Sequence, residues 1–450
     1  MSTGTFKYVP AGCCYSKFAN LSVYWRPANN KSFKQRRIND KTIVYHCHDR
    51  DLIIIKESMN NELVIGGDYN LVVFDVFDMR NNHIYEMDYF MSNYMKSSDS
   101  DYSFKNTKKN PNITLLSDSG GFQIIEGRTD FIDPVDVAHW YDKNTHAGMV
   151  LDIPSSRIRE KDILKRTARI QRLNNELMLN VCKKAELINI VHGSSLDNRL
   201  YYHEQTKNDK IPRIAIGGMK NYPIHEIIYT TLSIFKEDSS YKQYHILGIT
   251  RQATLLALAY ASLVPGLNIT TDSSSHVQTA KSGTYFLHTP KLTQLILNSK
   301  SVDSEDWILP CQCPVCSIMK YANVMSKNVS WVTSLYALHN AFVINKFCKY
   351  AVECARQGRD TMNHLASLVV SDKTVRRELT KAFDLVDEYL ESSTVKSAYA
   401  GNRSPILTPM DWGDSNDFTK RVLAALKNME KYHATQKNKI PSEQRKRNTR

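Results

Sequence analysis

Residues 115–123 read Leu-Leu-Ser-Asp-Ser-Gly-Gly-Phe-Gln and bring together groups that could hold a small molecule. The apolar run from Ile113 to Leu116 predicts a buried strand, which ends near a carboxylate followed by two glycines. Glycine lets the backbone approach a ligand, phenylalanine offers a flat apolar face, and the glutamine amide both donates and accepts hydrogen bonds. The residues concerned are Asp118, Gly120, Gly121, Phe122 and Gln123. This segment predicts a binding site for a flat, polar heterocycle.

A second carboxylate, Asp272, follows the apolar run Leu267–Thr270. Together with Asp118 at the end of another strand, it could divide the work of a nucleophile and a general acid/base. Displacement at the anomeric carbon of a sugar needs such a pair of carboxylates. Two plainer interpretations stay open: Asp118 could close an Asx turn, and Asp272 could cap a helix that begins in Ser273–His276.

Polar residues or glycines also end three further apolar runs. Asp152 could accept hydrogen bonds from the amino and ring N–H groups of a guanine edge, or it could cap a helix that begins near Ser156. The pair Gly217 and Gly218 could offer open backbone groups to the same ring, or could simply form a turn. His192 has no evident proton to move, so we interpret it as a structural histidine.

The pattern Cys311-x-Cys313-x-x-Cys316 places three thiols close enough together to wrap one metal ion. Thiolates favour zinc in a tetrahedral site, and His339 on the following helix is the candidate fourth ligand. Four protein ligands leave no open position, so this Zn²⁺ would be structural. The alternatives are three unligated thiols and, for His339, a histidine satisfied within the core.

The elements that must position these residues follow a repeating pattern, in which a short apolar run ends in small or polar residues and a helical stretch follows. The runs are Asn70–Asp75, Ile113–Leu116, Gly148–Leu151, Leu187–Val191, Ile214–Ile216, His245–Leu247 and Leu267–Thr270. Strands that alternate with helices predict an α/β fold, here a (β/α)8 TIM-like barrel whose chemistry lies after the strand C-terminal ends. A doubly wound open sheet is the second choice, because no Gly-x-Gly-x-x-Gly phosphate loop opens any unit.

The pattern changes after residue 300, where helical stretches without strands follow the cysteines. We expect a catalytic barrel over residues 1–300, a zinc-binding subdomain with its helix over 301–357, and a helical, basic C-terminal extension over 358–450. Helices are predicted over Val329–Arg356 and Val375–Leu390, whereas Asn402–Asp417 is typical of a loop.

The composition is that of a globular protein, with 42% hydrophobic and 23% charged residues among 450. Without a leader or a bilayer-spanning apolar run, we expect a cytoplasmic protein with no membrane partner. The net charge is +13, and Lys420–Arg450 holds ten Lys or Arg against two Glu. A second basic cluster spans Lys31–Lys41, after Tyr24 and Trp25. Such segments indicate nucleic acid as the partner, although a solvated tail is the plain alternative.

Together these residues resemble the tRNA-guanine transglycosylase superfamily over roughly residues 60–345. Asp-Ser-Gly-Gly-Phe-Gln at 118–123 matches its signature, Ala215-Ile-Gly-Gly-Met219 its Ala-Ile-Gly-Gly-Leu element, and Leu247-Gly248 its Met-Gly. The cysteines and the later His339-Asn340 pair resemble its zinc site. The resemblance implies a (β/α) barrel with a zinc-binding insertion.

The resemblance also implies a role for each site residue. Asp272 would be the nucleophile that bonds to ribose C1′ as guanine leaves, and Asp118 the general acid/base that deprotonates an incoming 7-deazaguanine. Phe122 would stack on the base, with Leu247 on its other face. The remaining substrate-binding residues would be Ser119, Gln123, Asp152, Gly217 and Gly218.

The sequence departs from the bacterial tRNA enzymes near the nucleophile. Thr271–His276 and Ala280–Gly283 replace a Phe-Asp-Cys-Val context and an Arg-Asn-Ala-Arg-Asn-Gly tract, and Val191-His-Gly-Ser194 replaces a base-contacting Val-Gln-Gly-Gly. No RNA-binding appendage of the archaeal type is recognisable. This combination resembles the DpdA-type DNA 7-deazaguanine transglycosylases of bacteria and phages. We therefore expect guanine in DNA to be exchanged for a base such as preQ0, with tRNA exchange and an inactive nucleic-acid-binding barrel as alternatives.

Overall fold

The computed structural model describes residues 3–11, 34–37, 42–47, 50–55, 62–67, 69–75, 89–94, 114–282, 284–287, 294–296, 329–393 and 415–439. Cys311, Cys313 and Cys316 lie outside these residues, as do most of the loop expected over 402–417 and the end of the basic tail. The basic cluster at 31–41 is described only as a strand backbone over 34–37.

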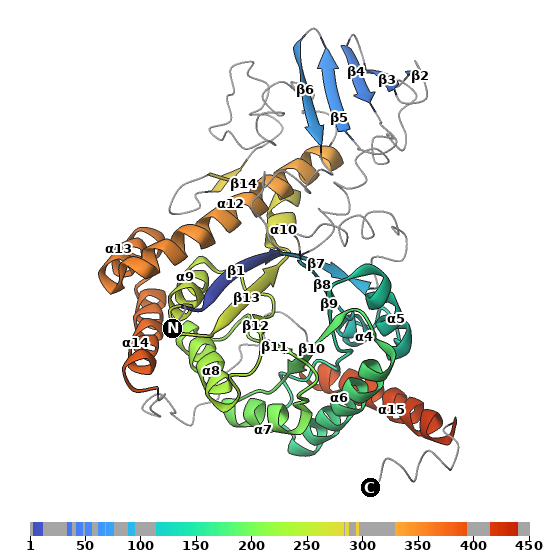
Figure 1. The fold of residues 1–450 in the computed structure, drawn as a ribbon, viewed down its shortest axis with the longest axis vertical. Helices are drawn as coiled ribbons and strands as arrows, with labels where there is room; N and C mark the ends of the chain where they lie inside the picture. The colour runs from blue at the N-terminus through green and yellow to red at the C-terminus, as the bar shows by residue number, and fades with distance from the viewer. Residues whose placement is uncertain are drawn as a thin grey trace.

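The centre of the molecule is one eight-stranded parallel sheet whose strands follow one another in chain order around a curl (Figure 1). Its strands are β1 (Thr5–Pro10), β7 (Tyr89–Asn93), β8 (Thr114–Asp118), β9 (Ala147–Met149), β10 (Glu186–Val191), β11 (Arg213–Ile216), β12 (Gln243–Ile246) and β13 (Asn268–Ser273). A parallel bridge between Ala11 and Met91 joins the chain after β1 to β7, the strand at the opposite edge. The α/β fold is therefore TIM-like, and the doubly wound alternative, which needs a reversal of strand order, is wrong.

Helices cover the outside of the curled sheet in the alternation that the sequence predicts (Figure 1). They are α4 (Gly121–Ile125), α5 (Pro134–Asn144), α6 (Lys161–Val181), α7 (Leu196–Thr206), α8 (Ile224–Glu237), α9 (Gln252–Ala261) and α10 (Ser275–Lys281). Local signals fix several starts: the Asp133 side chain accepts from the Val135 N–H with proline at the first helical position of α5, and Ser195 caps α7. α6 buries Leu164, Ala168 and Met178 along one face.

The side chains that point into the barrel are apolar on most strands and polar on two of them. Strands β1 and β7 to β11 fill it with a small apolar cluster: Val9, Ala11, Met91, Leu116, Ala147, Met149, Ile188, Ile190 and Ala215. On β12 and β13 the neighbouring inner positions hold polar side chains, since His245 is in register with Ala215 and Asp272 with Val9. Buried polar groups need partners, so this side of the interior must be a hydrogen-bonded network.

Four further helices pack around the barrel. α12 (Val329–Gln357) runs diagonally along one side of the barrel and packs against α10 and α9 (Figure 1). At its end, α13 (Arg359–Val369) packs against α9, and α14 (Lys373–Ser392) packs against α8 and α9. α15 (Ser415–Lys439) lies on the opposite side against α6 and α4. Buried Val422, Leu426 and Met429 join the core beneath those helices. No helix among the described residues is long and apolar enough to cross a membrane.

One predicted strand has a different place. Asn70–Asp75 belongs to β6 (Tyr69–Asp75), which pairs antiparallel with β5 (Glu62–Gly67) and takes no part in the parallel sheet. It lies in an insertion between β1 and β7, together with the antiparallel strands β2 (Lys34–Arg37), β3 (Thr42–Cys47) and β4 (Arg50–Ile55). A short hairpin of β14 (Thr284–Phe286) and β15 (Gln294–Ile296) follows α10.

Candidate active site

Asp272 stands at the C-terminal end of β13 with one carboxylate oxygen held in place. Its Oδ1 accepts a hydrogen bond from the Gly248 backbone N–H at 2.8 Å and lies 3.2 Å from His245 Nε2. No hydrogen bond from a described residue reaches Oδ2, and the side chain is 13% exposed. The helix-cap interpretation is wrong, because the N-cap position of α10 is Ser274 and Asp272 bonds elsewhere. One oxygen is thus oriented while the other can act as a nucleophile.

Asp118 ends β8 on the same inner face of the sheet. It is two residues from Leu116, a member of the inner apolar cluster, and alternate residues of a strand share a face. Its Oδ1 accepts from the Gly120 N–H at 3.2 Å, so the expected Asx turn is present. Gly120 has φ +85°, a left-handed conformation that favours glycine and starts α4 directly after the turn. Asp118 is half-buried, which leaves part of its carboxyl group accessible.

Asp152 is the centre of a second carboxylate cluster, after β9. Its Oδ2 lies 2.8 Å from His192 Nε2, and its Oδ1 accepts from the Ser119 hydroxyl at 3.3 Å. The other ring nitrogen of His192, Nδ1, lies 2.9 Å from the Ser156 hydroxyl. The cap interpretation of Asp152 is wrong, since the next helix, α6, starts only at Lys161. The Asp152 side chain is 7% exposed and that of His192 4%, so the pair is buried together.

Glycines at two positions permit this close packing. A Cβ on Gly121 would lie 2.3 Å from the Asp152 carbonyl oxygen, and one on Gly217 would lie 2.7 Å from His192 Cε1. Gly218 has φ +72° and faces Ser156. The Gly217 N–H donates to the Val191 carbonyl, so the open backbone donor expected of it is already used. The glycines therefore let the Asp152–His192 pair pack against the backbone.

Tyrosines and a histidine beneath the carboxylates stay uncharged. Burial, reinforced by the charges of Asp118 and Asp152, raises the pKa of Tyr141 well above its ordinary value, and its hydroxyl donates to the Met149 carbonyl at 2.8 Å. Burial lowers the pKa of His276, on α10, to about 3, and its Nδ1 lies 3.1 Å from the Tyr8 hydroxyl. Neither Tyr141 nor His276 therefore adds a charge beside the carboxylates.

The remaining predicted base contacts flank the same site. Phe122 and Gln123 lie half-buried on α4, and Leu247, half-buried after β12, packs against the inner apolar cluster. The Gln123 amide oxygen accepts from Arg128 at 3.1 Å, which orients the amide.

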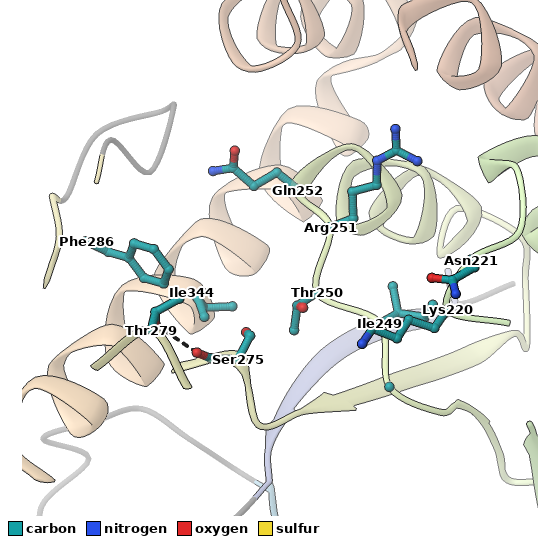
Figure 2. Close-up of a pocket in the computed structure, with 11 residues that line it drawn as sticks. Lys220, Asn221, Ile249, Thr250, Arg251, Gln252, Ser275, Thr279, Phe286 and Ile344 are labelled. Carbon is teal, nitrogen blue, oxygen red and sulfur yellow. Dashed lines mark hydrogen bonds between the residues drawn. The ribbon is translucent and has the colours of Figure 1, made fainter. Parts of the chain in front are cut away.

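A pocket of about 380 Å³ opens next to Asp272 (Figure 2). Gly248, whose N–H holds Asp272, lines it. Figure 2 shows Phe286 and Ile344 on one side and Lys220 and Asn221 on the other, with Thr250 between them. Lys220 and Arg251 are exposed, and neither forms a salt bridge with a described residue. Cations beside an apolar wall suit an anionic, partly aromatic ligand such as a nucleotide.

His339 is the one predicted zinc ligand among the described residues. It is fully buried on α12, stacks on Tyr285 with ring centroids 3.8 Å apart, and its Nε2 lies 2.7 Å from the Phe286 carbonyl oxygen. A carbonyl only accepts, so Nε2 carries the proton and Nδ1 has the lone pair that a metal would need. The described residues contain no group of three potential metal ligands. His339 thus fits a zinc site, which stays a prediction.

Two site residues, His192 and His245, are not assigned a role by sequence reasoning. Each pairs with a carboxylate on the adjacent strand, Asp152 and Asp272 respectively. The signal that could have found them is that His192 follows one apolar run and His245 begins another, next to the runs that carry the carboxylates.

Comparison with known proteins gives two matches. A family model described as queuine tRNA-ribosyltransferase matches residues 102–362, more than half of the chain. A tRNA-guanine(15) transglycosylase from Sulfolobus acidocaldarius is 25% identical over 264 residues, which are 56% of this chain and 50% of that protein. The chain thus spans about half the length of this curated relative. The family match contains the whole region from β8 to β13, where the carboxylates lie.

Proposed function

Since the chain belongs to the queuine tRNA-ribosyltransferase family, we propose that it is a pentosyltransferase that exchanges guanine in DNA for a 7-deazaguanine base such as preQ0. The observation that carries this proposal is the pair Asp118 and Asp272 on the inner face at the C-terminal end of the barrel strands. Such carboxylates can supply a nucleophile and a proton carrier on one sugar carbon.

In the first displacement, Asp272 Oδ2 attacks C1′ of the target nucleotide. The C1′–N9 bond breaks and its electron pair leaves with guanine, which takes a proton from Asp118. Asp272 is suited to the attack because Gly248 and His245 hold its other oxygen. The product is an ester-like bond between Asp272 and C1′.

In the second displacement, N9 of the incoming 7-deazaguanine attacks C1′. Its N–H proton passes to the Asp118 carboxylate, and the bond between C1′ and Asp272 breaks to restore the free carboxylate. Asp118 thereby regains the proton that it gave up in the first step. Its half-buried position lets it meet both the leaving and the entering base.

The base would lie between Phe122 and Leu247, with Asp152 at its amino edge. A carboxylate accepts from the amino and ring N–H groups of guanine, which 7-deazaguanines share. Because His192 and Ser119 fix Asp152, its orientation is set before the base arrives. The backbone groups of Gly218 and the side-chain amide of Gln123 are further candidate contacts to the base.

A nucleic acid partner is supported by the basic segments of the sequence and by Lys220 and Arg251, which line the pocket beside Asp272. DNA is the proposed polymer because of the sequence departures beside Asp272. The alternative is base exchange in tRNA, which the name of the Sulfolobus relative favours. A structural Zn²⁺ held by Cys311, Cys313, Cys316 and His339 would tie the chain before α12 to the barrel.

The test is to incubate the protein with preQ0 and either duplex DNA, single-stranded DNA or tRNA, and to digest the polymer to nucleosides for mass spectrometry. We expect the 7-deazaguanine deoxynucleoside. The ribonucleoside alone would assign the enzyme to tRNA instead. A denaturation-resistant protein–nucleic acid adduct should form with wild type and not with Asp272→Asn. The matched control is Asp162→Asn, on the exposed face of α6, which should keep the adduct. No adduct with any polymer would favour the inactive nucleic-acid-binding barrel.

A further inference from the structure

The polar side of the barrel interior forms a continuous chain of hydrogen bonds that ends at Asp272. Arg213, on β11, bonds through Nη1 to the Gln243 side-chain oxygen on β12. The Gln243 amide nitrogen lies 2.6 Å from the Thr270 hydroxyl on β13, and that hydroxyl lies 2.8 Å from His245 Nδ1. His245 Nε2 then reaches Asp272 Oδ1. The strand register produces this ladder, because Arg213 is opposite Gln243 and His245 opposite Thr270.

The chemistry of these groups gives the chain one direction. A guanidinium only donates, so the Gln243 oxygen must face Arg213 and its amide nitrogen must face Thr270. The amide nitrogen also only donates, so the Thr270 oxygen accepts from it. At the other end the Asp272 carboxylate only accepts, so a neutral His245 ring must carry its proton on Nε2, and the Thr270 hydroxyl is then the donor to Nδ1. His245 Nδ1 is therefore the acceptor, and the ring proton resides on Nε2, where it is donated to Asp272.

Burial prevents water from rearranging these hydrogen bonds. His245 is fully buried, and Gln243 and Thr270 are each 3% exposed, so water cannot supply a substitute donor. At the far end, Arg213 is anchored by Glu186, whose Oε2 accepts from its Nε at 2.7 Å. Reversing one link would leave a buried donor facing a donor or an acceptor facing an acceptor.

We propose that His245 is a positioning residue for the nucleophile, locked in its Nε2-protonated tautomer by the directed chain Arg213–Gln243–Thr270. The inference rests on the proposed function only in taking Asp272 as the nucleophile. His245 and Gly248 together hold Oδ1, and this turns Oδ2 toward the sugar. The chain thus links the Arg213–Glu186 ion pair at the start of the strands to the reacting atom at their end.

The charged and titratable groups around His245 do not compete for this role. Asp272 on β13 and Arg213 on β11 are members of the chain, and Lys7 on β1 is the register partner of Thr270. Carboxylates, guanidinium and ammonium groups ordinarily titrate outside pH 6–8. His276, on α10, stays neutral because burial lowers its pKa to about 3.

The first experiment measures the single-turnover rate of adduct formation at pH 8 in Thr270→Val. The variant removes the hydroxyl that fixes the tautomer and keeps the side-chain shape. We expect the rate to fall about tenfold, the order expected for loss of one hydrogen bond to a charged group. Thr270→Ser, which keeps the hydroxyl, should retain most of the wild-type rate.

Thr231→Val is the matched control, since Thr231 is equally buried on α8 and its hydroxyl donates to the Ile227 carbonyl at 2.8 Å. It should keep the wild-type rate. A Thr270→Val rate equal to wild type, a loss in Thr270→Ser as large as in Thr270→Val, or an equal loss in Thr231→Val would each overturn the proposal.

The second experiment reads the tautomer directly in wild-type protein and needs no substrate. Nitrogen NMR of wild-type protein labelled at histidine, with His245→Gln to assign the signal, should show His245 protonated at Nε2 only. Protonation at Nδ1 would overturn the proposal. If the Nε2 tautomer is found but wild type forms no adduct, the proposed function fails while the directed chain stands. If Asp272→Asn abolishes the adduct but Thr270→Val behaves as wild type, only the chain fails.

Discussion

Replacing His192 with phenylalanine removes the 2.8 Å contact to Asp152 while keeping a ring of similar size in the core. The ring can still meet Tyr202, which packs edge-on against His192 with centroids 5.7 Å apart. The loss should therefore come mainly from the hydrogen bond. Both side chains are more than nine-tenths buried, and only the longer contact to Ser119 would remain on the Asp152 carboxylate.

The size of the effect follows from leaving a buried charge without its main partner. Breaking such a pair costs about 3–5 kcal/mol, and we expect about 3 kcal/mol of unfolding free energy because the Ser119 hydroxyl still bonds Asp152. In an Asp152→Asn background the charge is gone, and the same histidine replacement should cost about 1 kcal/mol. The difference, about 2 kcal/mol, is the coupling energy of the pair.

The assay is urea unfolding of wild type, both single variants and the double variant at pH 7. His203→Phe is the control, since His203 is also buried but its Nε2 lies 3.1 Å from a neutral partner, the Tyr241 hydroxyl. It should lose about 1 kcal/mol. A coupling energy below about 0.5 kcal/mol between positions 152 and 192 would refute the claim that His192 holds Asp152.

Two further predictions address charge. Arg251→Ala should weaken nucleic acid binding and reduce the slope of log affinity against log salt concentration by about 0.7–0.9, the share of one phosphate contact. Arg251→Lys should keep the slope. An unchanged slope in a salt titration of Arg251→Ala would show that the nucleic acid backbone does not contact Arg251. Burial lowers the pKa of His276 to about 3, whereas an unfolded histidine titrates near 6.5, so only the unfolded state gains this proton between those values. The folded protein should therefore lose about 2 kcal/mol from this group between pH 7 and pH 5, and His276→Phe should remove that loss in unfolding titrations; equal acid sensitivity in both proteins would contradict it.

The barrel strands from β8 to β13 could be predicted from the sequence, because each is a short apolar run followed by small or polar residues and then by a helical stretch. Asp118 and Asp272 stand at such ends, and the fold brings their strands' inner faces to the same end of the barrel. The first two strands were harder. β1 alternates between apolar and polar residues, and β7 is short and flanked by polar sequence.

The run Asn70–Asp75 shows why local pattern does not decide topology. It has the composition of a buried parallel strand, yet its neighbour is β5, with which it forms an antiparallel hairpin. Val64 and Val73 lie opposite each other in that pairing. Apolar side chains satisfy either arrangement, and the choice depends on which segment is adjacent in the chain and in space.

The two histidine contacts were missed for a related reason. His245 and Asp272 are 27 residues apart in the sequence, and their contact depends on the register of β12 against β13. Shifting that register by one residue would turn Thr270 and Asp272 away from the interior. A sequence shows which residues end a strand, but register is fixed by the packing of the whole barrel.

The three carboxylates of the site differ in burial and in their histidine contacts, and these differences match the role proposed for each. Asp272 and Asp152 are both buried beside a histidine whose second nitrogen is paired with a hydroxyl. A nucleophile and a base-reading group need one fixed orientation, which such a pair provides. A proton carrier must instead reach two different bases in turn and exchange protons with them. Asp118 is half-buried, so part of its carboxyl group is accessible to both bases, which suits it to that task.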